Sequence, residues 1–157
     1  MSSSTSGAQA HHATSRGEVV LSLDIDRILE DGGARQTVPA EFRYTPDSPL
    51  VVTVVFLVEG ISDIVWRIGR DLLHQGMSSL SGVGDVQMWP ARLEARPTAW
   101  LRLASPGMVA LFALPVLPLT RWLEDTYGLV PAGTETHGLD WDAVTTGLLK
   151  GPEMPSN

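Results

Sequence analysis

Hydrophobic and polar side chains alternate from Glu18 to Asp26, the first segment of the chain with a clear pattern. The apolar set consists of Val19, Leu21, Leu23 and Ile25. A period of two residues is typical of a β-strand that buries one face. Apolar and β-branched runs bounded by turn residues extend this interpretation along the chain. They predict strands at Glu18–Asp26, Val38–Tyr44, Leu50–Val58, Asp63–Ile68, Asp85–Trp89, Thr98–Ala104 and Met108–Leu114.

Two further patterns concern burial and helices. Leu50–Val58 is apolar at nearly every position, which predicts a central strand covered on both faces. Arg70–Gln75 allows about two helical turns, and Gly76 is expected to stop this helix in a left-handed conformation. Apolar residues spaced by three and four predict a second helix at Pro118–Thr126, and a third follows an N-cap at Asp140. We therefore expect an α+β fold of mainly antiparallel sheets, with about seven strands and three helices.

Composition narrows the class of protein. The chain has 157 residues, enough for one domain at 18–150, between a disordered N-terminal tail at 1–17 and a C-terminal tail at 151–157. A formal net charge of −7 disfavours nucleic acid and anionic membranes as default partners. The absence of cysteine excludes disulfides and thiolate chemistry. No signal peptide or run long enough to span a bilayer is visible, so we expect a cytoplasmic protein.

No group of residues has the spacing that catalysis or metal binding requires. His74 and His137 lack a second ligand at helical spacing, and exposed histidine is the simpler interpretation of both. Gly82-Val83-Gly84 lacks the third glycine of a dinucleotide fingerprint. The adjacent carboxylates at Asp24/Asp26, Glu124/Asp125 and Asp140/Asp142 are explained by solvation or helix capping. We therefore expect no enzymatic activity, no cofactor, no metal and no small-molecule substrate.

Tryptophan and arginine are the residues that most favour a protein interface. The chain contains five tryptophans, and each falls on an expected element. Trp100 shares a strand face with Arg102, which suggests that another element or another subunit covers this face. The candidate interface residues are Trp89, Trp100, Arg102 and Trp122, with core packing as the alternative for each tryptophan.

Short motifs occur in a recognisable order along the chain: Val38-Pro39-Ala40, Arg43-Tyr44, Val65-Trp66, Ser105-Pro106, Val130-Pro131 and Gly133-Thr134-Glu135. Two further motifs are more specific, Arg70-Asp71-Leu72-Leu73 and Gly84-Asp85-Val86 with Trp89-Pro90. These two also mark a helix and a strand start, so a structural role explains them. Together, over roughly Glu18 to Leu149, the motifs resemble the actinobacterial SsgA-like family of sporulation and cell-division proteins.

The resemblance implies a fold like that of the whirly single-stranded nucleic-acid-binding proteins, assembled as a trimer. It also implies a non-enzymatic role in placing the septum, by recruiting the tubulin-like FtsZ or by positioning an SsgA- or SsgB-type paralogue, with concentration at septa. A single-stranded nucleic-acid-binding module is the alternative, from fold analogy. The branch of the family, the direct partner and a role in growth or in sporulation stay open at this stage.

The amount of apolar surface predicts self-association. Leu50–Val58 and Met108–Leu119 offer more apolar area than the expected helices can cover. Exposed apolar patches of several hundred Å² are unusual on monomers and mark association sites. We therefore expect a homo-oligomer, specifically a trimer with strand residues near its axis.

Overall fold

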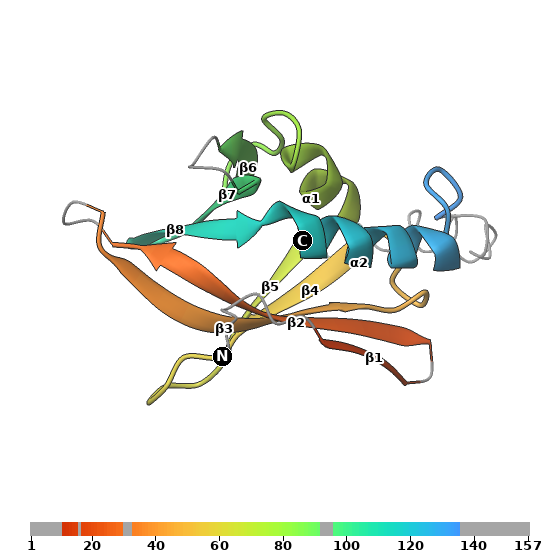
Figure 1. Ribbon diagram of the computed structural model, residues 1–157, viewed down its shortest axis with the longest axis horizontal. Coiled ribbons are helices and arrows are strands. Elements are labelled where there is room, and N and C mark those ends of the chain that lie inside the picture. Colours follow the sequence, from red (N-terminus) through yellow and green to blue (C-terminus); the bar gives the residue numbers. More distant parts are fainter. Residues whose placement is uncertain (1–10, 16, 30–32, 92–95, 136–157) are drawn as a thin grey trace, which may run out of the picture.

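The computed structural model describes residues 11–15, 17–29, 33–91 and 96–135 (Figure 1). Eight strands and two helices lie in this part of the chain. In chain order they are β1 (His11–Ser15), β2 (Glu18–Ile28), β3 (Arg35–Tyr44), β4 (Val51–Phe56), β5 (Ile64–Gly69), α1 (Arg70–Gly76), β6 (Val86–Ala91), β7 (Thr98–Ser105), β8 (Met108–Pro115) and α2 (Val116–Leu129).

All strand pairings are antiparallel, and the strands follow the order β5-β4-β3-β2-β8-β7-β6. The sheet divides at β2, because the edge of β2 that does not pair with β3 is shared by two partners. Residues 18–22 of β2 pair with β1, whereas Asp26–Ile28 pair with Leu111–Ala113 of β8. The β6–β7–β8 half can therefore turn back over the β2–β5 half, and Figure 1 shows β6, β7 and α1 above the long strands.

The core lies between the two halves of this curled sheet. Val19, Leu21, Leu23 and Ile25 are all buried, which confirms the face that their alternation predicts. Across the core, Phe56 of β4 stacks on Phe112 of β8 with ring centroids 4.6 Å apart. This contact joins the two halves of the sheet. The antiparallel pairings together with the two helices confirm the expected α+β class.

Both helices pack on the inner face of the sheet. Trp122 of α2 is fully buried and lies 6.1 Å from the Phe42 ring on β3. Gly76 of α1 packs on β6, where a Cβ atom at this glycine would lie 2.5 Å from Met88 Cβ and Cγ. Gly76 is not the expected left-handed stop. The residue that ends α1 is Met77, and its φ of −80° is in the right-handed region. Close contact with β6 is the reason for glycine at this position.

Two expectations at the strands are wrong. His11–Ser15 lies in the tail expected to be disordered, yet it pairs with Glu18–Ser22 as β1. Main-chain hydrogen bonds form this pairing, so it needs no apolar alternation. The strand expected at Leu50–Val58 is not covered on both faces: β4 is next to the edge strand, and Val51, Thr53 and Val55 are only half-buried.

The third expected helix, after Asp140, falls outside the described residues, as do the C-terminal tail and most of the Asp31–Gly33 turn. Among the residues that the structure describes, no helix is long and apolar enough to cross a membrane.

Candidate functional site

Trp89 and Trp100 face each other across β6 and β7 on the outer face of the sheet. Both side chains are half-buried. The same row continues through Ala113 of β8 to Asp26 of β2. Directly opposed residues hold their Cβ atoms about 5 Å apart, so the two tryptophans are neighbours on this face of the sheet.

Arg102 lies in the next row of this outer face. It is opposite Gln87 on β6 and Leu111 on β8, and its Nη1 donates a long hydrogen bond of 3.5 Å to Gln87 Oε1. We call Trp89, Trp100, Arg102 and Leu111 the tryptophan face. It combines aromatic area with one cation, the composition that anchors many protein interfaces.

The described helices leave the tryptophan face uncovered, because α1 and α2 pack on the opposite side of the sheet. The fourth candidate interface residue, Trp122, is a different case. Its exposed fraction is 0%, and it packs in the core with Leu119 and Leu123. Helical periodicity places Trp122 on the same face of α2 as these leucines, so it has no surface to offer a partner.

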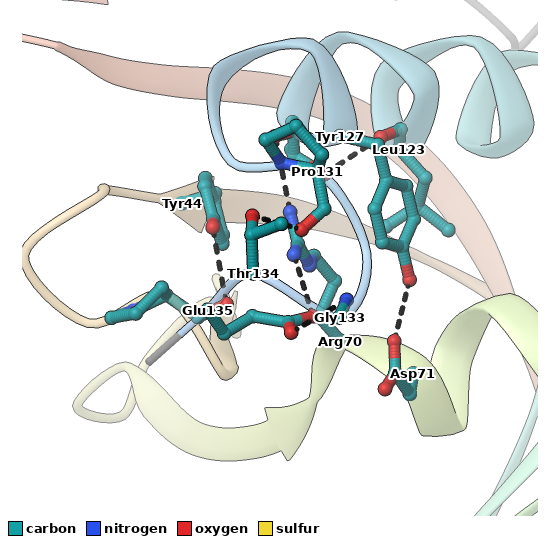
Figure 2. Close-up of polar contacts among 11 residues, drawn as sticks. Tyr44, Arg70, Asp71, Leu123, Tyr127, Pro131, Gly133, Thr134 and Glu135 are labelled. Carbon is teal, nitrogen blue, oxygen red and sulfur yellow. Dashed lines mark hydrogen bonds and ion pairs between the residues drawn. The ribbon is translucent and has the colours of Figure 1, made fainter. Parts of the chain in front are cut away.

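A second group of polar residues joins α1, α2 and the loop after α2 (Figure 2). Arg70, the first residue of α1, has an exposed fraction of 0%. Its Nη2 lies 2.8 Å from Glu135 Oε2, and its Nη1 donates a hydrogen bond of 3.0 Å to the carbonyl oxygen of Thr126. A buried cation needs such partners, because burial without them costs several kcal/mol.

Two tyrosines complete the surroundings of Arg70. The guanidinium carbon lies 3.9 Å from the centroid of the Tyr127 ring and 4.9 Å from that of Tyr44. The Tyr127 hydroxyl donates to Asp71 Oδ1 at 2.8 Å, and Tyr44 donates to the carbonyl oxygen of Pro49 at 3.0 Å. Cation–π contacts between desolvated groups add to the ion pair.

The electrostatics of this cluster favour its ionised form. The hydrogen bond from Arg70, together with backbone donors including Gly133 N, lowers the pKa of Glu135 below its ordinary value of 4.5. Burial, reinforced by the hydrogen bond to Asp71, raises the pKa of Tyr127 well above its ordinary value. Burial also raises the pKa of Tyr44. Near neutral pH the cluster is a charged ion pair between two neutral phenols.

These groups show no arrangement that would perform acid–base or metal chemistry. Within the described part of the chain, no group of three or more histidine, cysteine, aspartate or glutamate residues could hold a metal ion. His74 is exposed and makes an edge contact with Tyr127 at 5.3 Å, while His137 falls outside the described residues. We call Tyr44, Arg70, Asp71, Tyr127 and Glu135 the Arg70 cluster. Both terminal nitrogens of Arg70 have partners within the fold, whereas its buried Nε has no hydrogen-bond partner among the described residues. These contacts between α1, α2 and the following loop suit a structural role.

Comparison with known proteins assigns the family. The profile described as Streptomyces sporulation and cell division protein, SsgA, matches residues 38–135. A sporulation-specific cell division protein of Frankia casuarinae is 34% identical over 140 residues, which cover 89% of this chain and 95% of the relative. This chain belongs to the SsgA-like family.

Solved structures of SsgA-like proteins have the same fold. The SsgA-like sporulation-specific cell division protein of Thermobifida fusca gives a TM-score of 0.74 at 31% identity, covering 85% of this chain and 98% of that one. SsgB of Streptomyces coelicolor, in which mutations correlate with longitudinal cell division during sporulation, gives 0.72 at 31% identity, with 76% and 94% covered. The family is thus one of sporulation and cell-division proteins.

The structure places the residues of the Arg70–Leu73, Gly84–Pro90 and Pro131–Glu135 motifs in four locations. Leu72 and Leu73 of α1 pack against the core, and Leu73 is fully buried there. Gly84 has a φ of +82° in an exposed loop, and Asp85 ends this loop. Trp89 and Pro90 lie on β6, and the last group belongs to or adjoins the Arg70 cluster: Arg70, Asp71, Pro131, Gly133 and Glu135.

Sequence reasoning missed the pairing of Arg70 with Glu135. Both residues were recognised as motif residues, but 65 positions separate them in the chain. Charged side chains are almost never fully buried unless they are paired. A charged residue at a position expected to be buried would therefore indicate that an oppositely charged partner lies nearby. An arginine two positions before the apolar Leu72–Leu73 side of a short helix is a candidate for such burial.

Proposed function

We propose that this protein is a non-enzymatic regulator of division that helps place or assemble the septum by binding division proteins. FtsZ and an SsgA- or SsgB-type paralogue are the candidate partners. Membership of a family of sporulation and cell-division proteins supports the process. The tryptophan face is the observation that carries the binding role, because it is aromatic, half-buried and free of both helices.

Its location in the cell tests this proposal. A fluorescent fusion of the full chain is imaged in its host together with labelled FtsZ rings. The proposal expects the fusion to concentrate in the cytoplasm at septa and to coincide with the rings. A uniform distribution throughout growth and sporulation would contradict the proposed role, whatever the oligomeric state of the purified protein.

The tryptophan face gives a residue-level prediction. Replacing Trp100 by threonine, which keeps a β-branched residue in β7, is expected to weaken partner binding about tenfold, because aromatic anchors dominate interfaces. Titration against labelled, purified FtsZ and against the purified paralogue measures this loss. Val65→Thr is the matched control, since Val65 is a strand residue, 56% exposed, on the distant edge strand β5. Equal affinity of the Trp100 and Val65 variants would exclude the tryptophan face.

A second candidate function is binding of single-stranded nucleic acid. The aromatic pair beside Arg102 favours it, since bases stack on sheet aromatics next to cations. The net charge of −7 weighs against it. Binding to labelled single-stranded DNA that weakens steeply with salt would support this candidate over a protein partner.

We further propose that the chain forms a trimer. Apolar side chains that are exposed by about half or more are available for association on the described surface: Leu50, Ile61, Val65, Leu80, Val83, Met108, Val109, Leu117 and Leu129. Light scattering at micromolar concentration tests this proposal. A monomer mass would contradict it, and a dimer mass would replace the trimer.

A further inference from the structure

An apolar groove lies on the inner face of the sheet, opposite to the tryptophan face. It has a volume of about 120 Å³ and opens between β4–β5 and β7–β8. Its floor contains the stacked rings of Phe56 and Phe112. Ile64 and Trp66 of the edge strand β5 line one side, and Met108, which is 47% exposed, lines the other. The groove has the volume of about four water molecules in the liquid, enough for one branched aliphatic side chain.

One cation lies at this apolar groove. Of the described residues that line it, Arg27 alone is charged. Arg27 is opposite Gln36 on β3 and Phe112 on β8, so its side chain belongs to the inner face. No hydrogen bond or ion pair joins its guanidinium to another described residue. A suitable occupant therefore combines a small apolar side chain with a carboxylate nearby.

The loop between α1 and β6 carries that combination. Val83 is 89% exposed, so it does not lie in the groove of its own chain. It is flanked by Gly82 and Gly84, with φ values of +92° and +82°, and Asp85 follows as an exposed carboxylate. Because neither neighbour of Val83 has a side chain, the tip of this loop is narrow enough to enter a confined groove. We call Gly82–Asp85 the valine loop.

The valine loop is held in shape by the rest of the fold. Ser81 and Met88 exchange two backbone hydrogen bonds, of 2.8 and 2.9 Å, at its base. A Cβ atom at Gly82 would collide with the carbonyl oxygen of Val86 and would lie 3.0 Å from Leu72 Cδ1, so only glycine fits there. A loop with a fixed shape loses little conformational entropy when it binds, which favours association.

We infer that the groove receives the valine loop of a second copy of this chain, with Val83 against Phe56, Phe112 and Trp66 and with Asp85 paired to Arg27. The inference rests on the self-association proposed above and names the contact that would produce it. The groove and the valine loop lie at the same end of β7. The Asp85 carbonyl oxygen accepts a hydrogen bond from Ala104 N, while Leu103 and Ser105 line the groove. Near a symmetry axis, each copy can thus offer its loop to one neighbour and receive the loop of another. Head-to-tail contacts of this kind form a ring when the rotation between copies closes.

Charge reversal at the two ends of the contact tests this inference. Arg27→Glu and Asp85→Arg each place like charges together, so each variant is expected to self-associate at least tenfold more weakly in sedimentation or light scattering. The double variant R27E/D85R restores opposite charges and is expected to recover association. Leu117→Asp is the control, because Leu117 is an apolar residue, 56% exposed, on α2 and outside the groove.

The outcomes separate this contact from the rest of the proposed function. If the wild-type chain associates but neither reversal weakens it, or if the double variant stays as weak as the single variants, the contact is wrong while the trimer stands. A circular-dichroism melt of each variant excludes unfolding as the cause of a loss. An equimolar mixture of the single variants reports the symmetry, because contacts between unlike variants join opposite charges and contacts between identical variants join like charges. A three-membered ring keeps at least one contact between identical variants, whereas a two-fold dimer of unlike variants has none. Recovery of the mixture to the level of the double variant would therefore support the contact and contradict the trimer.

Discussion

Replacing Arg70 by methionine is expected to lower the free energy of unfolding by about 3 kcal/mol, near the lower limit for breaking a buried ion pair. The change removes the partner of Glu135, whose side chain is only 8% exposed, and the donor to the carbonyl oxygen of Thr126. It also removes the cation from the Tyr44 and Tyr127 rings. Urea unfolding near neutral pH measures the loss, and the melting temperature is expected to fall by about 6–12 °C for a chain of this length.

The double variant Arg70→Met with Glu135→Leu is the control for this interpretation. Replacing both charges by apolar groups of similar volume is often neutral, so the double variant is expected to be more stable than the Arg70→Met variant alone. If both variants lost the same stability, packing of the Arg70 side chain would be the cause and not its charge.

The same ion pair predicts how stability depends on acid. The pKa of Glu135 is lower in the folded chain than its ordinary value of 4.5. The contribution of the ionised Glu135 to the free energy of unfolding is therefore complete above that pH. The contribution is lost as the pH falls through the lowered pKa of the folded state. The Glu135→Gln variant should therefore lose less stability than the wild type when the pH falls below 4.5. Parallel acid titrations of unfolding would contradict the assigned pKa.

Replacing Gly76 by alanine is expected to destabilise the protein by about 2 kcal/mol, although alanine is the better helix former by about 1 kcal/mol. The new methyl group would lie 2.5 Å from Met88 Cβ, an atom that the backbone of β6 fixes in place. A change of the Met88 rotamer cannot relieve this contact, so α1 has to move away from β6. Thermal unfolding followed by circular dichroism measures the effect.

Gly128 in α2 offers the matched control for Gly76. Nothing lies within 4 Å of a Cβ atom built there, and its φ is not positive. Gly128→Ala is therefore expected to stabilise the chain by up to about 1 kcal/mol. Opposite signs at the two helical glycines would establish that close packing decides the result at Gly76. A stabilised Gly76 variant would contradict the observed distance between α1 and β6.

The strands were predictable because their signal is local. The alternation in Glu18–Asp26 marks both the strand and its buried face, since successive side chains point to opposite sides. The short helix at Arg70 follows from a similar local pattern. By contrast, β1 has no hydrophobic pattern, because its pairing with β2 uses main-chain groups that every residue carries.

Burial between distant elements could not be predicted from such patterns. Trp122 was a candidate for an interface because its residue type suits one, yet the curled sheet places it in the core beside Phe42. Leu50–Val58 resembled a central strand, but two apolar faces in sequence do not guarantee two covering layers in space. The expected helix after Asp140 falls outside the described residues, so it stays a prediction.

The sequence by itself determined the family, the antiparallel α+β class, the positions of seven of the strands along the chain and the buried face of strands with clear alternation, such as Glu18–Asp26. These properties depend on residue type and on neighbours a few positions away, which periodicity and motif order record directly. Only the tertiary structure decided the division of the sheet at β2, the pairing of Arg70 with Glu135 and the close contact of Gly76 with Met88. It also decided the position of the groove at Arg27 and of the exposed valine loop. Each of these joins residues that are distant in the chain, and their proximity depends on how the whole sheet curls.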